Sequence, residues 1–123
     1  MCLSLLWLIC SRIEWRPADN VTVVALGDVF PDRVENARKE LKEKHNIEIA
    51  AENCFVGFDA YQKVLAMNDI DVVLLCTPTH FRPEQFKAAV EAGKHIFMEK
   101  PCAVDPTGIR TVIAAAKVAT SKG

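Results

Sequence analysis

The chain has few glycines, and they do not form a glycine-rich phosphate-binding loop. Only five glycines occur among 123 residues, and the first of them is Gly27. Such a loop binds phosphate through backbone N–H groups at the start of a helix, and its closely spaced glycines let the backbone approach the ligand. The sequence therefore excludes this device from these 123 residues.

The chain also lacks an excess of charge of either sign. Lys and Arg total 15 and Asp and Glu total 16, so no basic face for nucleic acid is predicted. The apolar run from Leu5 to Cys10 is too short to span a bilayer, and it lacks the basic start and cleavage site of a signal peptide. With half of the residues hydrophobic and a quarter charged, the composition predicts one folded domain and no membrane partner.

The cysteines do not form the pairs that a disulfide framework needs. Their number is odd and no CxxC motif occurs; they stand at positions 2, 10, 54, 76 and 102. This pattern is typical of reduced thiols and predicts a cytoplasmic location. Cys76, His80 and Cys102 match no known ligand spacing, so no metal site is predicted.

Apolar runs and helix-start signals alternate along most of the chain. The expected strands are 21–26, 54–56, 71–76 and 95–98, and the expected helices run from 31 to about 44, 60 to about 66, 83–93 and 106 to about 120. Asp59 and Gln62 have the spacing of a capping box. The alternation predicts an α/β fold, a Rossmann-like doubly wound parallel sheet with helices on both faces.

Polar residues follow three of the expected strands. Asp28 comes after 21–26, Thr77 and Pro78 follow 71–76, and Glu99 and Lys100 follow 95–98. Because the carboxyl ends of parallel strands meet at one edge of a sheet, we expect one ligand crevice there. An acid in the position of Asp28 can accept hydrogen bonds from adenosine ribose hydroxyls, and its charge disfavours a 2′-phosphate, which favours NAD over NADP.

Each of these turns also has a purely structural interpretation. Asp28 could simply stabilise the start of the next helix, and the Thr77 turn could be an ordinary strand-to-helix connection. Glu99 and Lys100 could form a surface ion pair worth about 0–1 kcal/mol. Arg33, one helical turn after Asp28, could accommodate NADP. The convergence of three polar turns on one edge favours the binding site.

Residues 71–101 resemble the second half of the cofactor domain of the Gfo/Idh/MocA family, named after glucose–fructose oxidoreductase, inositol dehydrogenase and rhizopine catabolism. The family shows an apolar strand into a Thr-Pro turn, a helix ending in Ala-Gly-Lys, and a strand into Glu-Lys-Pro. These are present as Thr77-Pro78, Ala92-Gly93-Lys94 and Glu99-Lys100-Pro101. The stretch VVALGDVFPDR resembles the family's second strand, with Asp28 as the ribose acid. The resemblance covers about residues 18–122.

The resemblance implies oxidation or reduction of a carbinol carbon of a sugar, polyol or related compound, with NAD or NADP as cofactor. It implies Lys100 as the catalytic or substrate-orienting lysine. The cofactor neighbours that it implies lie in the three turns: Asp28, Thr77, Pro78, His80, Glu99 and Lys100. One position departs from the family, because many relatives carry histidine five residues after the threonine. This chain has Arg82 there, and His80 stands three residues after Thr77.

The amino terminus departs from the family more strongly. Members begin with a central strand, a glycine-rich turn and a helix, and they continue into a substrate-binding domain. We expect residues 1–17 to be an atypical apolar segment, helical over Leu3 to Trp15. Residues 18–123 would then be a partial NAD(P)-binding domain without the central strand or the substrate domain. The alternative, a central strand over Leu3 to Cys10, leaves barely enough chain for the return crossover.

These expectations bear on partners and on activity. An empty central position would leave two unpaired sheet edges, which recruit other chains, so we expect self-association. We expect a dinucleotide as partner, a sugar-like substrate only together with a second domain, and no turnover by this chain alone.

Overall fold

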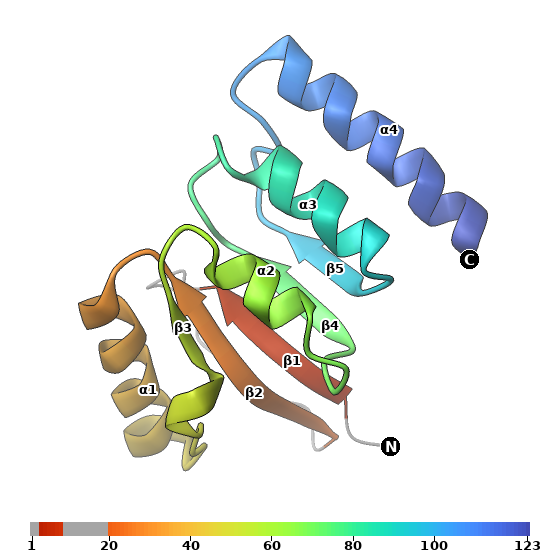
Figure 1. Ribbon diagram of the computed structural model, residues 1–123. Coiled ribbons are helices and arrows are strands. Elements are labelled where there is room, and N and C mark those ends of the chain that lie inside the picture. The colour runs from red at the N-terminus through yellow and green to blue at the C-terminus, as the bar shows by residue number, and fades with distance from the viewer. Residues whose placement is uncertain (1–2, 9–19) are drawn as a thin grey trace.

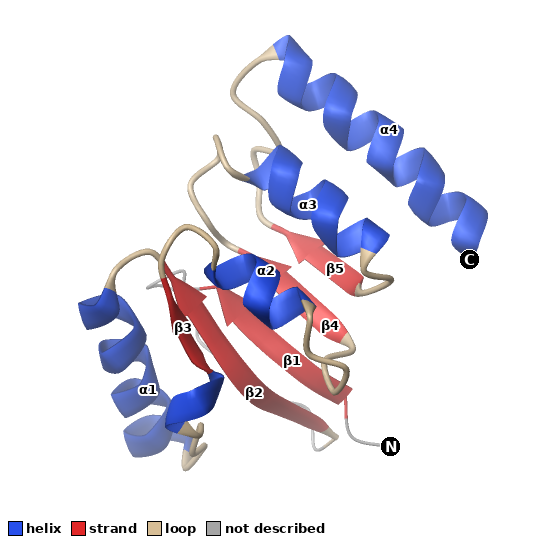
Figure 2. Ribbon diagram, viewed as in Figure 1, coloured by secondary structure: helices blue, strands red, loops and turns tan. Residues whose placement is uncertain are grey.

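The fold is a five-stranded sheet with helices against both of its faces, and the computed structural model describes residues 3–8 and 20–123 (Figure 1, Figure 2). The strand order is β3-β2-β1-β4-β5, and every ladder is parallel. The elements are β1 (Leu3–Leu8), β2 (Val21–Asp28), α1 (Pro31–His45), the 3-10 helix η1 (Ala51–Asn53), β3 (Cys54–Val56), α2 (Ala60–Leu65), β4 (Val72–Leu75), α3 (Arg82–Glu91), β5 (His95–Met98) and α4 (Pro106–Lys122). The predicted Rossmann-like parallel sheet is confirmed.

Two apolar cores lie on opposite faces of the sheet, because successive side chains of a strand alternate between faces. On one face, buried residues of β2 and β4 pack against α2 and α3; they are Ala25, Tyr61, Val64, Ile70, Val73, Leu75 and Ala89. On the other face, β2 packs against α1 through Val23, Leu26, Val34, Ala37, Leu41 and Ile49. The helix α4 packs on α3 at the end of the layer (Figure 1).

Helix boundaries follow local signals at most positions. Pro31 stands in the first turn of α1, and Asn46 ends the helix in the left-handed conformation with φ of 55°. The Asp105 side chain caps α4 by accepting a hydrogen bond from the Gly108 N–H at 2.6 Å. The capping box predicted at Asp59 is wrong, since this side chain makes no cap hydrogen bond. It pairs instead with Lys63 at 2.9 Å, which removes the carboxylate from the helix start.

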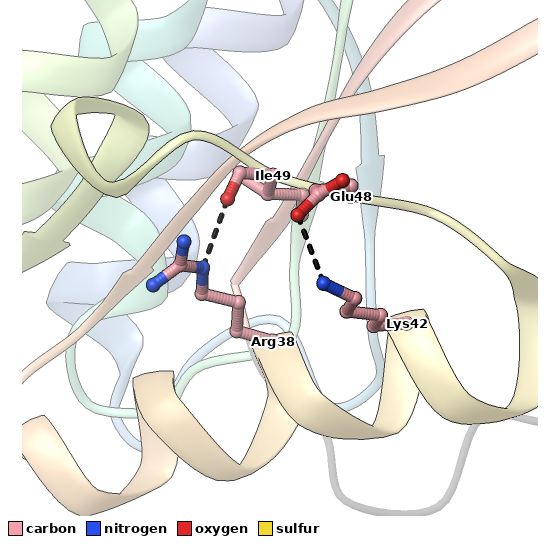
Figure 3. A network of polar contacts seen from close by, with 4 residues as sticks. All are labelled: Arg38, Lys42, Glu48 and Ile49. Carbon is pink, nitrogen blue, oxygen red and sulfur yellow. Dashed lines mark hydrogen bonds and ion pairs between the residues drawn. The ribbon is translucent and has the colours of Figure 1, made fainter.

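The segment between α1 and β3 is tied to the helix by side chains of α1 (Figure 3). Arg38 Nε donates to the Ile49 carbonyl at 2.9 Å, and Lys42 Nζ lies 2.9 Å from Glu48 Oε1. The Lys42 hydrogen bond and charge lower the pKa of Glu48 below its ordinary value. These contacts hold Ile49, which is buried, in the core beneath α1.

The predicted amino-terminal helix over Leu3 to Trp15 is wrong for the residues that the structure describes. Leu3–Leu8 is β1, which pairs with β2 on one side and β4 on the other. The central strand predicted to be missing is therefore present, and the alternative interpretation is correct on this point. A strand between two parallel neighbours satisfies the backbone N–H and C=O groups of all three, and this pairing outweighs the helix propensity of leucine. Residues 9–19 lie outside the described residues.

The presence of β1 removes the unpaired inner edges that were expected in the sheet. No gap is left between β2 and β4, so the reason given for self-association does not apply, and self-association itself is not tested by the fold. The predicted boundary at residue 17 falls outside the described residues, and β1 belongs to the same sheet as the rest. None of the helices in the described part of the chain is long and apolar enough to cross a membrane.

Candidate functional site

A cavity of about 1030 Å³ opens at the carboxyl edge of the sheet, where β2 and β4 end. Its walls come from the end of β2, the first half of α1, the turn before α2, and the turn between β4 and α3. The parallel sheet produces this arrangement because all strands end at one edge, and the helices that follow them lie on opposite faces. The volume is that of a small-molecule or cofactor site.

Asp28 closes β2 and lines this cavity. Its Oδ1 accepts a hydrogen bond from the Phe30 N–H at 2.9 Å, which fixes the carboxylate at the turn into α1. A carboxylate has lone pairs for further donors, so Oδ2 can accept from a ligand hydroxyl. The predicted cofactor neighbour Asp28 is thus in the cavity wall.

Thr77 and Pro78 lie in the opposite wall, after β4. The Thr77 Oγ1–H donates to Oε1 of Gln85 at 2.5 Å, and Gln85 is buried. This bond orients the hydroxyl toward α3, so that its oxygen can still accept from a ligand donor. Asp28 and Thr77, which are far apart in the sequence, therefore face one cavity.

Aromatic rings line the same cavity. The Phe58 and Phe81 rings lie 6.0 Å apart at 48°, and Phe58 is 71% exposed. The Arg33 guanidinium lies over the Phe30 ring, 5.2 Å from its centroid. Exposed rings beside a cavity offer flat apolar surfaces on which a heteroaromatic base can stack. These rings, together with Asp28, suit a nucleoside.

The cavity floor carries a chain of polar side chains. Gln62 Nε2 donates to the Tyr61 hydroxyl at 3.1 Å, and the Tyr61 O–H donates to Glu84 Oε1 at 3.4 Å. Tyr61 is buried, and Gln62 and Glu84 are exposed. The carboxylate and amide at this end can bind water or ligand hydroxyls, which adds polar specificity to the apolar walls.

Arg82 is the buried charged residue of this region, with 6% of its surface exposed. Its Nε donates to the Thr77 carbonyl at 2.7 Å, and its Nη1 donates to the carbonyls of Glu99 at 2.9 Å and Pro101 at 2.7 Å. Arg82 thereby connects the turn after β4 with the turn after β5. This residue stands where many relatives carry histidine, and its role was not predicted.

The remaining predicted site residues lie at the same edge of the sheet but outside the cavity wall. His80 is exposed and its ring contacts Phe81 edge-on at 5.4 Å. Glu99 is half-buried; its N–H donates to the Leu75 carbonyl at 3.1 Å. Lys100 is exposed and makes no ion pair or hydrogen bond with any described residue. The structure therefore brings Asp28, Thr77 and Pro78 together and leaves these three apart.

Several cavity residues were missed by sequence reasoning. Tyr61, Gln85 and Phe58 carry no motif, because their roles depend on which helix face or turn meets the cavity. Arg82 had one signal, its place five residues after Thr77, where the resembling family often has histidine. That departure pointed to the position without indicating what the guanidinium contacts.

The cavity fits the adenosine half of a nicotinamide dinucleotide. It joins a ribose acceptor, Asp28, to aromatic walls and to the Thr77 turn, which are the chemical groups such a ligand contacts. For the pyrophosphate, the Rossmann fold uses a glycine-rich turn directly after the first strand. The sequence after β1, residues 9–19, contains no glycine. The described residues therefore offer groups that can contact a nucleoside, and they supply no glycine-rich pyrophosphate loop.

The sequence and the fold both match known proteins. Residues 13–122 match the family model described as "Oxidoreductase family, NAD-binding Rossmann fold", GFO_IDH_MocA. A glycosyl hydrolase family 109 protein of Bacteroides thetaiotaomicron is 37% identical over 92 residues, 74% of this chain and 19% of the relative. A myo-inositol 2-dehydrogenase of Thermotoga maritima is 31% identical over 101 residues, 82% of this chain and 27% of the relative.

Solved structures share the fold at lower identity. The myo-inositol 2-dehydrogenase of Lactobacillus plantarum superposes with a TM-score of 0.74 at 19% identity, over 95% of this chain and 33% of that one. A 3-ketoreductase of Actinomadura kijaniata was solved with TDP-benzene and NADP. It has a TM-score of 0.65 at 24% identity, and the match covers 95% of this chain and 35% of the ketoreductase. The chain spans about a fifth of the length of the first curated relatives that it matches.

These matches confirm the predicted family and its cofactor class. The family model covers most of the chain, and its description names the NAD-binding Rossmann fold that the sheet shows. NAD or NADP is therefore the cofactor class of this domain. The chain belongs to the Gfo/Idh/MocA family of oxidoreductases, as a stretch of its NAD-binding Rossmann domain.

Proposed function

We propose that the chain is the nucleotide-binding part of an NAD(P)-dependent oxidoreductase that acts on a carbinol of a sugar, polyol or related compound. The cavity that unites Asp28 with the Thr77 turn is the observation that carries this proposal. Relatives named myo-inositol 2-dehydrogenase and glycosyl hydrolase family 109 protein support a sugar-like or polyol substrate. The cytoplasmic location stays a prediction from the cysteines.

Different side chains contact different parts of the dinucleotide. Asp28 accepts hydrogen bonds from ribose hydroxyls of the adenosine half, and its charge favours NAD over NADP. The Thr77 turn and the exposed Phe58 ring contact the nucleoside. When bound, the nicotinamide supplies the chemistry by accepting or donating a hydride. His80, in the turn after β4, and Glu99, directly after β5, are the further cofactor neighbours that we propose outside the cavity wall.

Lys100 has the proposed catalytic role, because it follows β5 at the edge where the cavity opens. Its ammonium group has no partner among the described residues, so all three of its N–H donors can reach a substrate hydroxyl. A lysine so placed orients the carbinol and accepts or returns the hydroxyl proton as the hydride moves.

We further propose that this chain alone does not turn over a substrate. It spans about a fifth of the length of its first curated relatives, and the described residues supply no glycine-rich turn for the pyrophosphate. The exposure of Lys100 outside the cavity wall favours one alternative, a non-catalytic nucleotide-binding or interaction module.

Binding and turnover should be measured separately on this chain. NADH titration followed by the fluorescence of the reduced nicotinamide should saturate at one site, and ADP-ribose should compete. Phe58→Ala should weaken binding about tenfold, because base–aromatic stacking contributes about 1–3 kcal/mol. The control Lys117→Ala should leave affinity within about twofold, since Lys117 is exposed on α4 and does not line the cavity.

Two results would contradict the proposal at different points. If NADH up to millimolar concentration does not bind, the nucleotide-binding function is wrong. If NADH forms when the chain is given NAD and a panel of sugars and polyols, the proposed absence of turnover is wrong. Binding without turnover by this chain is expected both for the nucleotide-binding part of an oxidoreductase and for a non-catalytic binding module. Lys100→Ala in a longer protein that has turnover then distinguishes the two functions. Its kcat should fall only if Lys100 is catalytic.

A further inference from the structure

The Arg82 guanidinium contacts three backbone carbonyls and no carboxylate. Its acceptors are the carbonyls of Thr77, Glu99 and Pro101, at 2.7, 2.9 and 2.7 Å. Within the described part of the chain no ion pair involves Arg82, and the residue is 6% exposed. Burying a cation is costly unless its donors are well satisfied, and here only carbonyl dipoles satisfy them.

The three carbonyl acceptors of Arg82 belong to two turns of the site. The Glu99 and Pro101 carbonyls flank Lys100, and both accept from the same nitrogen, Nη1. The Thr77 carbonyl, bonded to Nε, belongs to the turn in the cavity wall. The guanidinium is planar and rigid, so its fork sets the spacing between the two turns. Lys100 itself has no side-chain partner among the described residues, so its turn is held by the two Arg82 bonds and by the bond from the Glu99 N–H to the Leu75 carbonyl.

A second cation in the chain gives a contrast. Lys94 Nζ donates to the carbonyls of Met67 and Ile70 at 2.7 and 2.8 Å. These contacts attach the amino end of β5 to the loop before β4, whereas Arg82 acts at the carboxyl end of β5. Both cations contribute to stability, and only Arg82 contacts the turn that carries Lys100.

We propose that Arg82 is a positioning residue, which sets the Glu99-Lys100-Pro101 turn relative to the Thr77 turn and thereby places Lys100 for the nicotinamide half of the cofactor. This inference rests on the proposed function, because it assigns Lys100 to that half. It predicts that losing the guanidinium loosens the Glu99-Lys100-Pro101 turn more than the Thr77 turn, because the Thr77 hydroxyl keeps its bond to Gln85.

The test compares Arg82→Gln with the matched control Lys94→Gln. Each variant removes one cation from backbone carbonyls near β5, the buried Arg82 or the partly buried Lys94. Backbone ¹⁵N relaxation should show the Lys100 amide order parameter falling from about 0.85 to below about 0.6 in Arg82→Gln alone. The amides of α1 should stay rigid in both variants. This measurement needs no ligand.

Ligand binding supplies the readout that a general loss of stability would not change. NADH should bind Arg82→Gln about tenfold more weakly than the unsubstituted chain, which corresponds to about 1.4 kcal/mol. ADP-ribose, which lacks the nicotinamide, should lose less affinity in Arg82→Gln than NADH does, because the Thr77 hydroxyl keeps its bond to Gln85. Lys94→Gln should show no such split between the two ligands.

The outcomes separate this inference from the proposed function. If the unsubstituted chain binds neither ligand, the proposed function is wrong, and the order parameters still decide whether Arg82 holds the turn. A rigid Lys100 amide in folded Arg82→Gln, or equal loosening in Lys94→Gln, would overturn the positioning role. If Arg82→Gln does not fold, Arg82→Lys takes its place, because one ammonium cannot reproduce the fork. Unfolding of both would overturn the inference by making Arg82 a general stability residue.

Discussion

We expect the cofactor preference of the cavity to depend on one carboxylate, that of Asp28. In the native chain the Phe30 N–H donates to Asp28 Oδ1 at 2.9 Å. Asparagine has a side chain of the same size, and its oxygen can accept the same hydrogen bond. The substitution removes the charge and replaces the second carboxylate oxygen by an NH₂ donor. Asp28→Asn therefore separates the electrostatic role of this residue from its role in the turn into α1.

The magnitude follows from the position of the charge. A 2′-phosphate about 5 Å from the carboxylate is repelled by roughly 3 kcal/mol per unit charge at an effective dielectric constant of about 20, and by about half of that in wetter surroundings. Asp28 is half-buried, so the smaller value is appropriate. Loss of the charge also weakens the bond to the ribose hydroxyl, because hydrogen bonds to charged groups contribute about 1.5–3 kcal/mol and neutral ones about 1 kcal/mol.

Both effects move the preference in the same direction. The ratio of the NADPH and NADH dissociation constants should fall about 10- to 100-fold in Asp28→Asn, since each 1.4 kcal/mol is a factor of ten. Fluorescence titrations with both reduced dinucleotides measure this ratio, and the effect should shrink as salt is raised. The control Asp32→Asn removes an exposed carboxylate of the same helix start that does not line the cavity. An unchanged ratio in Asp28→Asn would refute the electrostatic argument and leave Asp28 as a turn residue.

Two further predictions concern stability and thiol chemistry. Asp105→Ala should lower the free energy of unfolding by about 1 kcal/mol in urea denaturation, because it removes the cap on the Gly108 N–H; equal stability would show that α4 does not need this cap. Burial raises the pKa of the Cys54 thiol, so Cys54 should react with iodoacetamide more slowly in the native chain than in urea at pH of about 8.5, the ordinary thiol pKa. Mass spectrometry measures both rates, and the difference should narrow as the pH rises above the raised pKa; a faster native reaction would contradict this reasoning.

The strands and helices from Val21 onward could be predicted because their signals are local. Apolar β-branched runs indicate buried strands, and Pro31, Gly93 and Asp105 stand at helix boundaries that the structure confirms. The strand β1 could not be assigned in this way. Leu3–Leu8 is a leucine-rich segment whose state is decided by pairing with β2 and β4, and those partners are distant in the sequence.

The candidate site was predictable only at the level of backbone position. Strand order places Asp28, the Thr77 turn and the Lys100 turn at one edge, and this follows from parallel topology alone. Which side chains enter the cavity depends on contacts across the fold. Arg82 is the clearest case, since its acceptors lie 5, 17 and 19 residues away and its burial requires that β4 and β5 be already in register.

The two halves of the proposed site, the cavity beside Asp28 and the turn that carries Lys100, differ in how they are built. The half that we propose for adenosine is a walled cavity, where Asp28 and Thr77 are held by hydrogen bonds to Phe30 and Gln85. The turn after β5 carries the exposed Lys100, and the buried Arg82 guanidinium bonds to the carbonyls on both sides of it. We therefore expect that dinucleotide preference and the placement of Lys100 can be changed by different substitutions. Substitutions at Asp28 should alter which dinucleotide binds, whereas substitutions at Arg82 should alter how well its nicotinamide end is held.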